Sequence, residues 1–155
     1  MIRRLTGEQV VDLALRLEEI SWNWTSSEIA EVLRTAQLTP LDSLDISSIP
    51  IEHPDLRGVR GFVVNLNERS VVLEINVTLT EVSPRNDIHA QDQMDVAFQE
   101  YLTALISTFG DPDDYPEESV IAWDRGEERL NLRRLGIAVD LSWQGDEGIH
   151  FYDND

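Results

Sequence analysis

The acidic segment at residues 111–118, with the sequence Asp-Pro-Asp-Asp-Tyr-Pro-Glu-Glu, is the densest group of side chains that could do chemistry. Carboxylate oxygens suit calcium, which binds about six to eight of them. An EF-hand loop that begins at Asp111 needs glycine at its sixth position and glutamate at its twelfth. Pro116 and Ala122 occupy those positions. The segment is more typical of an acidic turn between a helix and a strand, and we expect no metal site and no cofactor.

The other residue types that perform catalysis show no supporting pattern. His53, His89 and His150 lie in different regions, and none has a second histidine at the spacing of a metal site. The chain has no cysteine, which excludes thiol nucleophiles and zinc–thiolate sites. Glu74 and Trp123 could belong to a glycosidase-like site, but solvated charge on a sheet surface explains Glu74 more simply. We therefore expect a protein that is not an enzyme.

The charge of the chain points to recognition. The sequence has 30 acidic and 12 basic residues, a net charge of −18, and all the basic residues are arginine. Nucleic acids and anionic membrane surfaces are bound through clusters of basic residues, so both are disfavoured as partners. A basic protein would be attracted and steered. Host composition, salt adaptation and solubility are alternative explanations of the acidity that the sequence leaves open.

The acidic residues are concentrated in the C-terminal part of the chain, where residues 111–155 contain 13 acids and four arginines. If the last strands form a meander, several of these acids lie on neighbouring turns and form one negative face. Aromatic residues can anchor such a contact. The candidate partner-binding residues are Asp111, Asp113, Asp114, Tyr115, Glu117, Glu118, Asp124, Glu127, Trp143, Asp146, Glu147 and Tyr152.

Two short helices are expected near the N-terminus to support this face. The first covers about residues 7–20, because Thr6 and Gln9 have capping-box spacing ahead of an apolar stripe. The second follows Thr25 and Glu28, which have the same spacing, and ends near residue 36. Trp22 and Trp24 lie in the connector between the helices, and we expect them to pack helix against sheet.

Strands with alternating polarity follow. Residues 37–57 contain three prolines and predict a short edge strand and a loop. Strands are expected at 59–66 and 70–80, joined by a hairpin turn at 67–69. In the second strand Leu73, Ile75, Val77 and Leu79 alternate with polar residues, Glu74 among them, which predicts one exposed face.

The rest of the chain predicts one long helix and three more strands. The helix begins after Asp87 and ends at Phe109, before Gly110 and Pro112. Strands are expected at 119–124, 128–135 and 137–143, and residues 148–152 are the candidate for a last strand. The order α-α-(β)-β-β-α-β-β-β predicts a single α+β domain over residues 1–155, with helices packed on an antiparallel sheet of about five or six strands.

No apolar run approaches the roughly 20 residues that span a bilayer. Acidic residues interrupt what would be a secretory apolar region at the N-terminus. We expect a cytoplasmic protein that is a monomer or a weak dimer.

Several motifs together resemble a known kind of protein. They are the helix that leads from Leu13 into Trp-Asn-Trp24, the segment Phe109-Gly110 to Pro112, the segment Ile121 to Trp123, and the run Leu130-Asn131-Leu132-Arg133-Arg134. This combination resembles an uncharacterised family of small acidic bacterial proteins of immunity type, encoded beside polymorphic toxins. The resemblance implies that the protein neutralises a cognate toxin, and it implies no catalytic residues. A cytoplasmic chaperone for a secreted effector is the alternative function.

Overall fold

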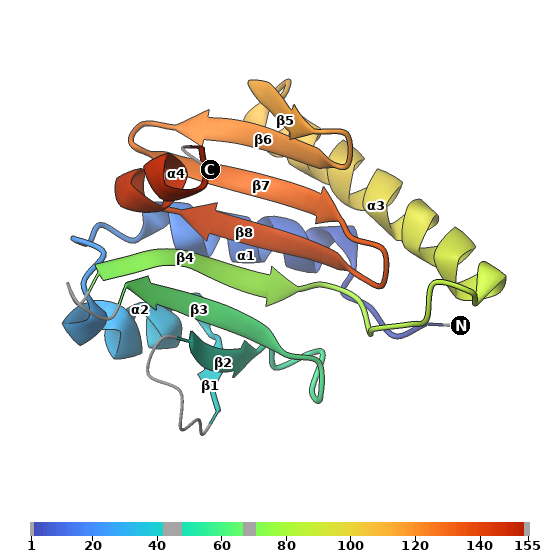
Figure 1. The fold of residues 1–155 in the computed structure, drawn as a ribbon, viewed down its shortest axis with the longest axis horizontal. Coiled ribbons are helices and arrows are strands. Elements are labelled where there is room, and N and C mark those ends of the chain that lie inside the picture. The colour runs from blue at the N-terminus through green and yellow to red at the C-terminus, as the bar shows by residue number, and fades with distance from the viewer. Residues whose placement is uncertain (1, 42–47, 67–70, 154–155) are drawn as a thin grey trace.

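The computed structural model describes residues 2–41, 48–66 and 71–153, except for the side chains of residues 65, 66, 152 and 153. This part of the chain is α+β, with an antiparallel sheet of eight strands and four α-helices (Figure 1). The strands are β1 (Thr39–Pro40), β2 (Ser48–Glu52), β3 (Gly61–Leu66), β4 (Val71–Thr78), β5 (Asp114–Glu117), β6 (Val120–Arg125), β7 (Glu128–Arg134) and β8 (Val139–Gln144). The helices are α1 (Gly7–Glu19), α2 (Ile29–Ala36), α3 (Ile88–Phe109) and α4 (Asp146–Asp153), with a 3-10 turn at Ser26–Glu28.

The sheet consists of two antiparallel meanders placed side by side. Its strand order is β1-β2-β3-β4-β8-β7-β6-β5, so the last strand of each meander forms the central seam. Across the seam Ile75 of β4 lies opposite Trp143 of β8. The predicted antiparallel sheet with helices packed on it is confirmed, but it has eight strands rather than the predicted five or six. Residues 37–57 supply β1 and β2, and the acidic segment predicted as a turn contains the edge strand β5.

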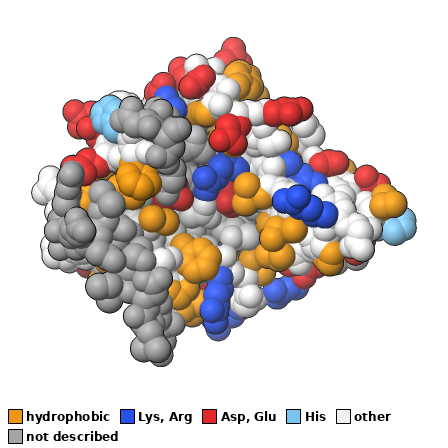
Figure 2. Space-filling view, in the orientation of Figure 1, with side chains coloured by type: hydrophobic (Ala, Val, Ile, Leu, Met, Phe, Trp, Pro, Cys, Tyr) orange, Lys and Arg blue, Asp and Glu red, His pale blue; other side chains and the backbone are white. Residues whose placement is uncertain are grey.

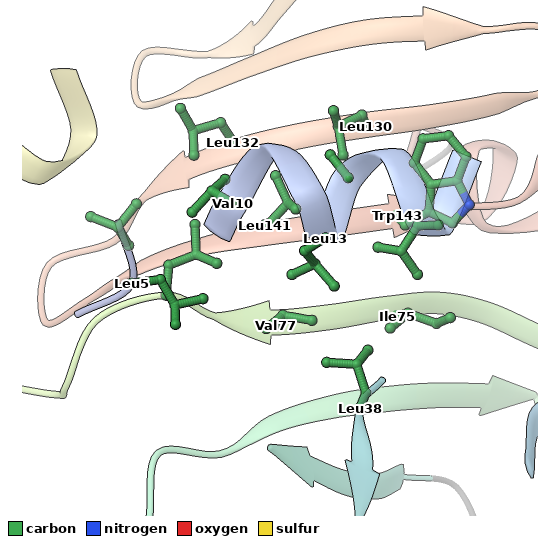
Figure 3. Close-up of a cluster of buried hydrophobic side chains, with 14 of the residues drawn as sticks. Leu5, Val10, Leu13, Leu38, Ile75, Val77, Leu130, Leu132, Leu141 and Trp143 are labelled. Carbon is green, nitrogen blue, oxygen red and sulfur yellow. The ribbon is translucent and has the colours of Figure 1, made fainter. Parts of the chain in front are cut away.

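Three helices cover one face of the sheet and enclose the core. In Figure 1, α1, α2 and α3 lie behind the strands, whereas α4 lies in front of them. The predicted capping box of α1 is present, since Thr6 and Gln9 each bond to the other's backbone N–H. Val10 and Leu13 of α1 then face the inner side chains of β7 and β8 (Figure 3).

The long helix α3 has the predicted boundaries. The Asp87 side chain accepts a hydrogen bond from the backbone N–H of Ala90 and caps the helix. The helix ends at Gly110, whose φ of +87° suits glycine better than other residues. Tyr101 is fully buried, and its hydroxyl donates to the carbonyl oxygen of Leu5 at 2.7 Å, which ties α3 to the N-terminal segment.

The C-terminal residues expected to form a strand form α4 instead. This helix packs against β4, and a Cβ added to Gly148 would lie 2.0 Å from the carbonyl oxygen of Leu73. Only glycine allows two backbones to approach this closely. Residues 148–152 are therefore helical and cover one end of the outer face of the sheet.

Glu74 on the polar face of β4 is buried rather than exposed. Glu74 is only 4% exposed, because its carboxylate accepts hydrogen bonds from Ser142 at 2.8 Å and Gln144 at 3.2 Å. The guanidinium of Arg133 lies 3.7 Å from the same carboxylate. The alternating pattern predicted that water would solvate Glu74. Side chains on β7 and β8 provide its polar partners instead.

The second predicted capping box does not form. The Glu28 carboxylate accepts hydrogen bonds from the Thr25 hydroxyl at 2.7 Å and from the backbone N–H of Asn23 at 3.1 Å. These contacts fasten the connector that contains Trp22 and Trp24 to the 3-10 turn before α2. The predicted hairpin turn at 67–69 lies outside the described residues.

Candidate functional site

A cleft of about 450 Å³ lies at one end of the sheet, where four segments meet. They are the connector between α1 and α2, the start of β4, the turn between β6 and β7, and the first turn of α4. The residues that line the cleft are Trp22, Asn23, Trp24, Val71, Val72, Glu127, Glu128, Asp146 and Glu147. The cleft therefore combines an aromatic wall with four carboxylates.

The aromatic wall consists of two stacked tryptophans. The rings of Trp22 and Trp24 have centroids 4.4 Å apart and an interplanar angle of 28°. Trp24 has a φ of +57°, which is rare for a bulky residue and costs of order 1–3 kcal/mol. Its carbonyl oxygen accepts from the N–H of Val72 at 2.8 Å, and its indole Nε1 donates to Glu128 at 3.0 Å. Contacts with two strands thus hold the ring in place.

Gly145 leaves the space that the Trp24 ring occupies. A Cβ added to Gly145 would lie 2.6 Å from the indole ring, so any larger residue would push the ring away. Gly145 is the last residue before α4, and its N–H donates to the carbonyl of Leu73 at 3.4 Å. The position of Trp24 and the start of α4 are therefore fixed together.

The described residues that line the cleft include four acids and no lysine, arginine or histidine. Arg125 belongs to the same hairpin as Glu127, but it forms an ion pair with Glu18 at 2.7 Å and lies 4.9 Å from the ring of Phe109. Nearby like charges oppose the ionisation of a carboxyl group, and nearby unlike charges favour it.

The Glu128 carboxyl is the most perturbed acid of the cleft. Burial raises its pKa above the usual glutamate range, and the nearby charges of Glu18 and Glu127 raise it further. The indole N–H groups of Trp24 and Trp143 act in the opposite direction and favour the carboxylate. Folding therefore brings this carboxylate into an environment that resists its negative charge.

A Glu128→Gln variant is expected to be more stable than the parent protein at neutral pH. Folding raises the pKa of Glu128, so its ionised form lowers the free energy of unfolding of the parent protein. This loss grows as pH rises from about 4.3, the ordinary glutamate pKa, through the raised value. Glutamine carries no charge and its carbonyl can still accept from Trp24. The gain should appear as a higher urea midpoint at pH 7 and should shrink towards pH 4.

Glu117→Gln is the matched control, since Glu117 is exposed on β5 and should give nearly the same urea midpoint as the parent at both pH values. A Glu128→Gln variant that is less stable than the parent at pH 7 would contradict the assigned environment of Glu128.

Two buried indole N–H groups near the cleft lack a hydrogen-bond partner in the described part of the chain. They are the Nε1 atoms of Trp22, which lines the cleft, and of Trp143. Trp143 Nε1 forms no hydrogen bond of regular geometry, but it lies near enough to Glu128 to lower the pKa of that carboxyl. A buried unsatisfied donor costs about 1–3 kcal/mol. An acceptor on a bound molecule could satisfy the N–H of Trp22.

The candidate partner-binding residues fall into two groups rather than one negative face. Glu127, Asp146 and Glu147 line the cleft. Seven others gather at the β5 edge, where acidic side chains line the upper rim in Figure 2. This second group is Asp111, Asp113, Asp114, Tyr115, Glu117, Glu118 and Asp124. We call these residues the β5 edge group.

Contacts within the β5 edge group reduce its negative potential. Arg129 forms an ion pair with Asp124 at 2.8 Å and lies 3.8 Å from Asp114. The Asp113 carboxylate accepts from the backbone N–H of Asp124 at 2.8 Å, which braces the edge. Tyr115 is 64% exposed and is the large aromatic side chain of this group.

Two tryptophans that the sequence offered as site residues belong to the core. Trp143 is 1% exposed on the helix-covered face of β8, where Leu130 lies opposite it on β7. Trp123 is also 1% exposed, and its Nε1 donates to the carbonyl of Gly110 at 2.9 Å. Trp123 faces the core while Glu74 faces the outer side of the sheet, so the glycosidase-like pair does not assemble. The side chain of Tyr152 lies outside the described residues.

Sequence reasoning missed three residues of the cleft. Trp22 and Trp24 were expected to pack helix against sheet, and both do pack against the core, but neither was named as a site residue. Glu128 was not among the candidate residues either. Their signal was present as two tryptophans two positions apart and a Glu-Glu pair after Gly126. Only the fold shows that these segments meet, since they are about a hundred positions apart.

The described residues contain neither a metal-binding cluster nor a membrane-spanning helix. No group of three or more histidine, aspartate or glutamate side chains there is placed to hold a metal ion. No helix in that part of the chain is long and apolar enough to cross a membrane.

Fold and site together define an α+β protein with an acidic, tryptophan-walled cleft at the end of an antiparallel sheet. Residues 8–145 match the model of a family of unknown function (DUF6301), and the chain belongs to that family. No curated protein and no solved structure matches the chain.

Proposed function

We propose that the protein is a non-enzymatic binding protein that neutralises a basic toxin in the cytoplasm by covering the active site of that toxin. The cleft carries this proposal, because two stacked tryptophans and four acidic residues line it. Aromatic anchors in a concave site provide affinity, and the surrounding charge selects the partner.

The charge of the whole chain supports the same partner chemistry. A net charge of −18 attracts a basic protein from a distance and raises the association rate at low ionic strength. Toxins that act on anionic substrates, such as nucleases or NAD-consuming enzymes, bind those substrates with cationic side chains. Carboxylates from the cleft would pair with these cations and exclude the substrate.

Mixing the protein with its cognate toxin should give a tight 1:1 complex on a sizing column, without toxin activity. The association rate should fall by about tenfold or more between low and physiological salt, because screening shortens the range of the steering field. Stopped-flow fluorescence at several salt concentrations measures that rate. Two proteins that elute separately, or an association rate independent of salt, would contradict the proposal.

A chaperone for a secreted effector is the second candidate, and one surface favours it. Ile88 and Val96 on α3 are 74% and 63% exposed, and an apolar pocket of about 240 Å³ lies beside Val96. Such a surface could hold an apolar segment of an effector. The two functions differ in a cell assay, since an immunity protein abolishes the toxicity of its partner whereas a chaperone promotes export without inhibition.

A further inference from the structure

We propose that His53 is a pH-sensitive switch: its neutral ring holds residues 53–59 closed over the core, and protonation of the ring releases them. These residues connect β2 to β3 and are called the β2–β3 segment (Figure 1). None of them lines the Trp22–Trp24 cleft, so the inference goes beyond the proposed function and does not depend on it.

The closed β2–β3 segment buries a side chain at every third position. His53, Leu56 and Val59 are 4%, 2% and 7% exposed, whereas the residues between them are exposed. Leu56 and Val59 pack into the main hydrophobic core. His53 is buried beside them in the sequence although its side chain is polar and can carry a charge. The contacts of this ring therefore decide whether the segment stays closed.

The ring of His53 closes the segment through an acceptor atom. Its Nδ1 accepts a hydrogen bond from the backbone N–H of Asp55 at 3.0 Å. Because that N–H is a donor, Nδ1 must have a free lone pair, and the proton of the neutral ring is on Nε2. In the imidazolium form both ring nitrogens carry protons and neither can accept. Protonation of His53 thus breaks the bond that closes the turn over residues 53–55.

The charged groups that act on the ring oppose one another. Burial lowers the pKa of His53 below the usual histidine range, the Asp55 carboxylate raises it, and the Arg16 guanidinium on α1 lowers it. Asp55 lies 3.9 Å from Nδ1, and its carboxylate also accepts a hydrogen bond from the Gln9 side chain of α1 at 3.1 Å. The closed segment consequently resists protonation of His53, whereas a released and solvated ring titrates near 6.5, the ordinary value.

The remaining polar contacts of the β2–β3 segment lie at the surface. The Glu52 carboxylate at the end of β2 accepts a hydrogen bond from the N–H of Gly58 at 3.1 Å. The guanidinium of Arg3 donates to the carbonyl oxygen of Arg57 at 2.9 Å. Both hydrogen bonds are exposed, and water competes with bonds of this kind. The segment can therefore open while the strands on either side stay paired, and opening exposes its apolar side chains.

Acid is the condition that opens the segment. The pKa of His53 is lower in the closed form than in the released form, so closure is favoured most strongly above about 6.5. As pH falls below this value and through the lowered pKa, the released form binds a proton that the closed form lacks. Each unit of difference between the two pKa values changes the opening equilibrium by about tenfold.

The test is amide hydrogen exchange of the isolated protein, measured by ¹H–¹⁵N NMR from pH 7.5 to pH 5, with each rate divided by the intrinsic rate at that pH. We expect the protection of the Asp55 and Leu56 amides to fall by about fivefold or more over this range. The amide of Leu79, which donates to the carbonyl oxygen of Val139 at the seam of the sheet, should stay at least about tenfold better protected than Leu56 at pH 5.

His53→Asn is the variant that retains the turn without titrating. The side-chain oxygen of asparagine accepts from a backbone N–H two residues on, which is the place of the Asp55 N–H, and asparagine gains no proton in this pH range. Protection of the Asp55 amide should then change by less than about twofold between pH 7.5 and pH 5. His89→Asn, at an exposed position near the start of α3, is the matched control and should keep the pH dependence of the parent.

Titration of the His53 ring, followed through its carbon-bound proton signals in the parent protein, provides a second measurement if His53→Asn does not fold. A midpoint below about 6.5 is expected. A midpoint at or above that value, protection of Asp55 that does not depend on pH in the parent, or equal protection of Leu56 and Leu79 at pH 5 would overturn the inference. The same holds if a folded His53→Asn variant keeps the pH dependence of the parent.

Discussion

A Trp24→Ala variant is expected to bind the toxin about 30- to 1,000-fold more weakly than the parent. Truncating an aromatic anchor at the centre of an interface costs about 2–4 kcal/mol. In the proposed complex Trp24 is such an anchor, because it stacks on Trp22 and donates a hydrogen bond to Glu128 through its indole N–H. The variant removes the aromatic wall and leaves the Glu128 carboxylate without that donor. Isothermal titration calorimetry of the complex measures the loss.

Tyr115→Ala is the matched aromatic control for this prediction. Tyr115 is 64% exposed in the β5 edge group, so it can be truncated without loss of core packing. We expect its removal to change affinity less than threefold. If Tyr115→Ala weakens binding strongly while Trp24→Ala does not, the toxin binds the β5 edge and the cleft is not the interface. Urea unfolding of both variants checks that each is folded.

Ion pairs between elements of the fold neutralise part of the acidic charge of the chain. Several arginines form ion pairs that join elements of the fold: Arg4 with Glu100, Arg125 with Glu18, Arg129 with Asp124, Arg133 with Asp140 and Arg134 with Asp95. These pairs neutralise acids on α1, α3 and the C-terminal strands. The described residues that line the cleft are four acids and five uncharged residues. Figure 2 shows basic side chains across the middle of the sheet.

The elements that the sequence predicted well are those with local signals. The capping residues Thr6 and Asp87 and the stop at Gly110 mark the ends of α1 and α3 directly. The edge strand β5 gives no such signal. Its four residues are all exposed and include Pro116, so neither alternating polarity nor β propensity marks it. Pairing with β6 makes it a strand.

The cleft could not be predicted because tertiary contacts create it. The helix α4 is short, and the sequence from Gly148 to Tyr152 fits a strand as well as a helix. Its structure is decided by the close approach of Gly148 to the backbone of Leu73. The same helix places Asp146 opposite the connector with Trp22 and Trp24. A sequence analysis that predicts a strand in place of α4 therefore does not bring these residues together and misses the cleft.

Trp143→Ala is expected to lower the free energy of unfolding by about 3–5 kcal/mol, the usual cost of truncating a large aromatic residue in a core. Trp143 is 1% exposed at the central seam, where Ile75 and Leu130 lie opposite it on the two neighbouring strands. Alanine would leave a cavity between the two meanders. Domains are stable by only about 5–15 kcal/mol, so the loss approaches the total. Urea unfolding followed by circular dichroism measures it.

The expected effect of Trp143→Ala is on stability rather than on recognition, and this separates it from Trp24→Ala. Trp143 faces the helices, and it can affect partner binding only through its interaction with Glu128. Below the unfolding transition, the folded fraction of Trp143→Ala should bind the toxin within about tenfold of the parent, whereas Trp24→Ala should unfold near the parent midpoint and bind poorly. A Trp143→Ala protein with parental stability and abolished binding would place this ring at the interface instead, as the sequence pattern had indicated. Such a result would require the seam between β4 and β8 to open when the toxin binds, because a ring that is 1% exposed cannot otherwise reach a partner.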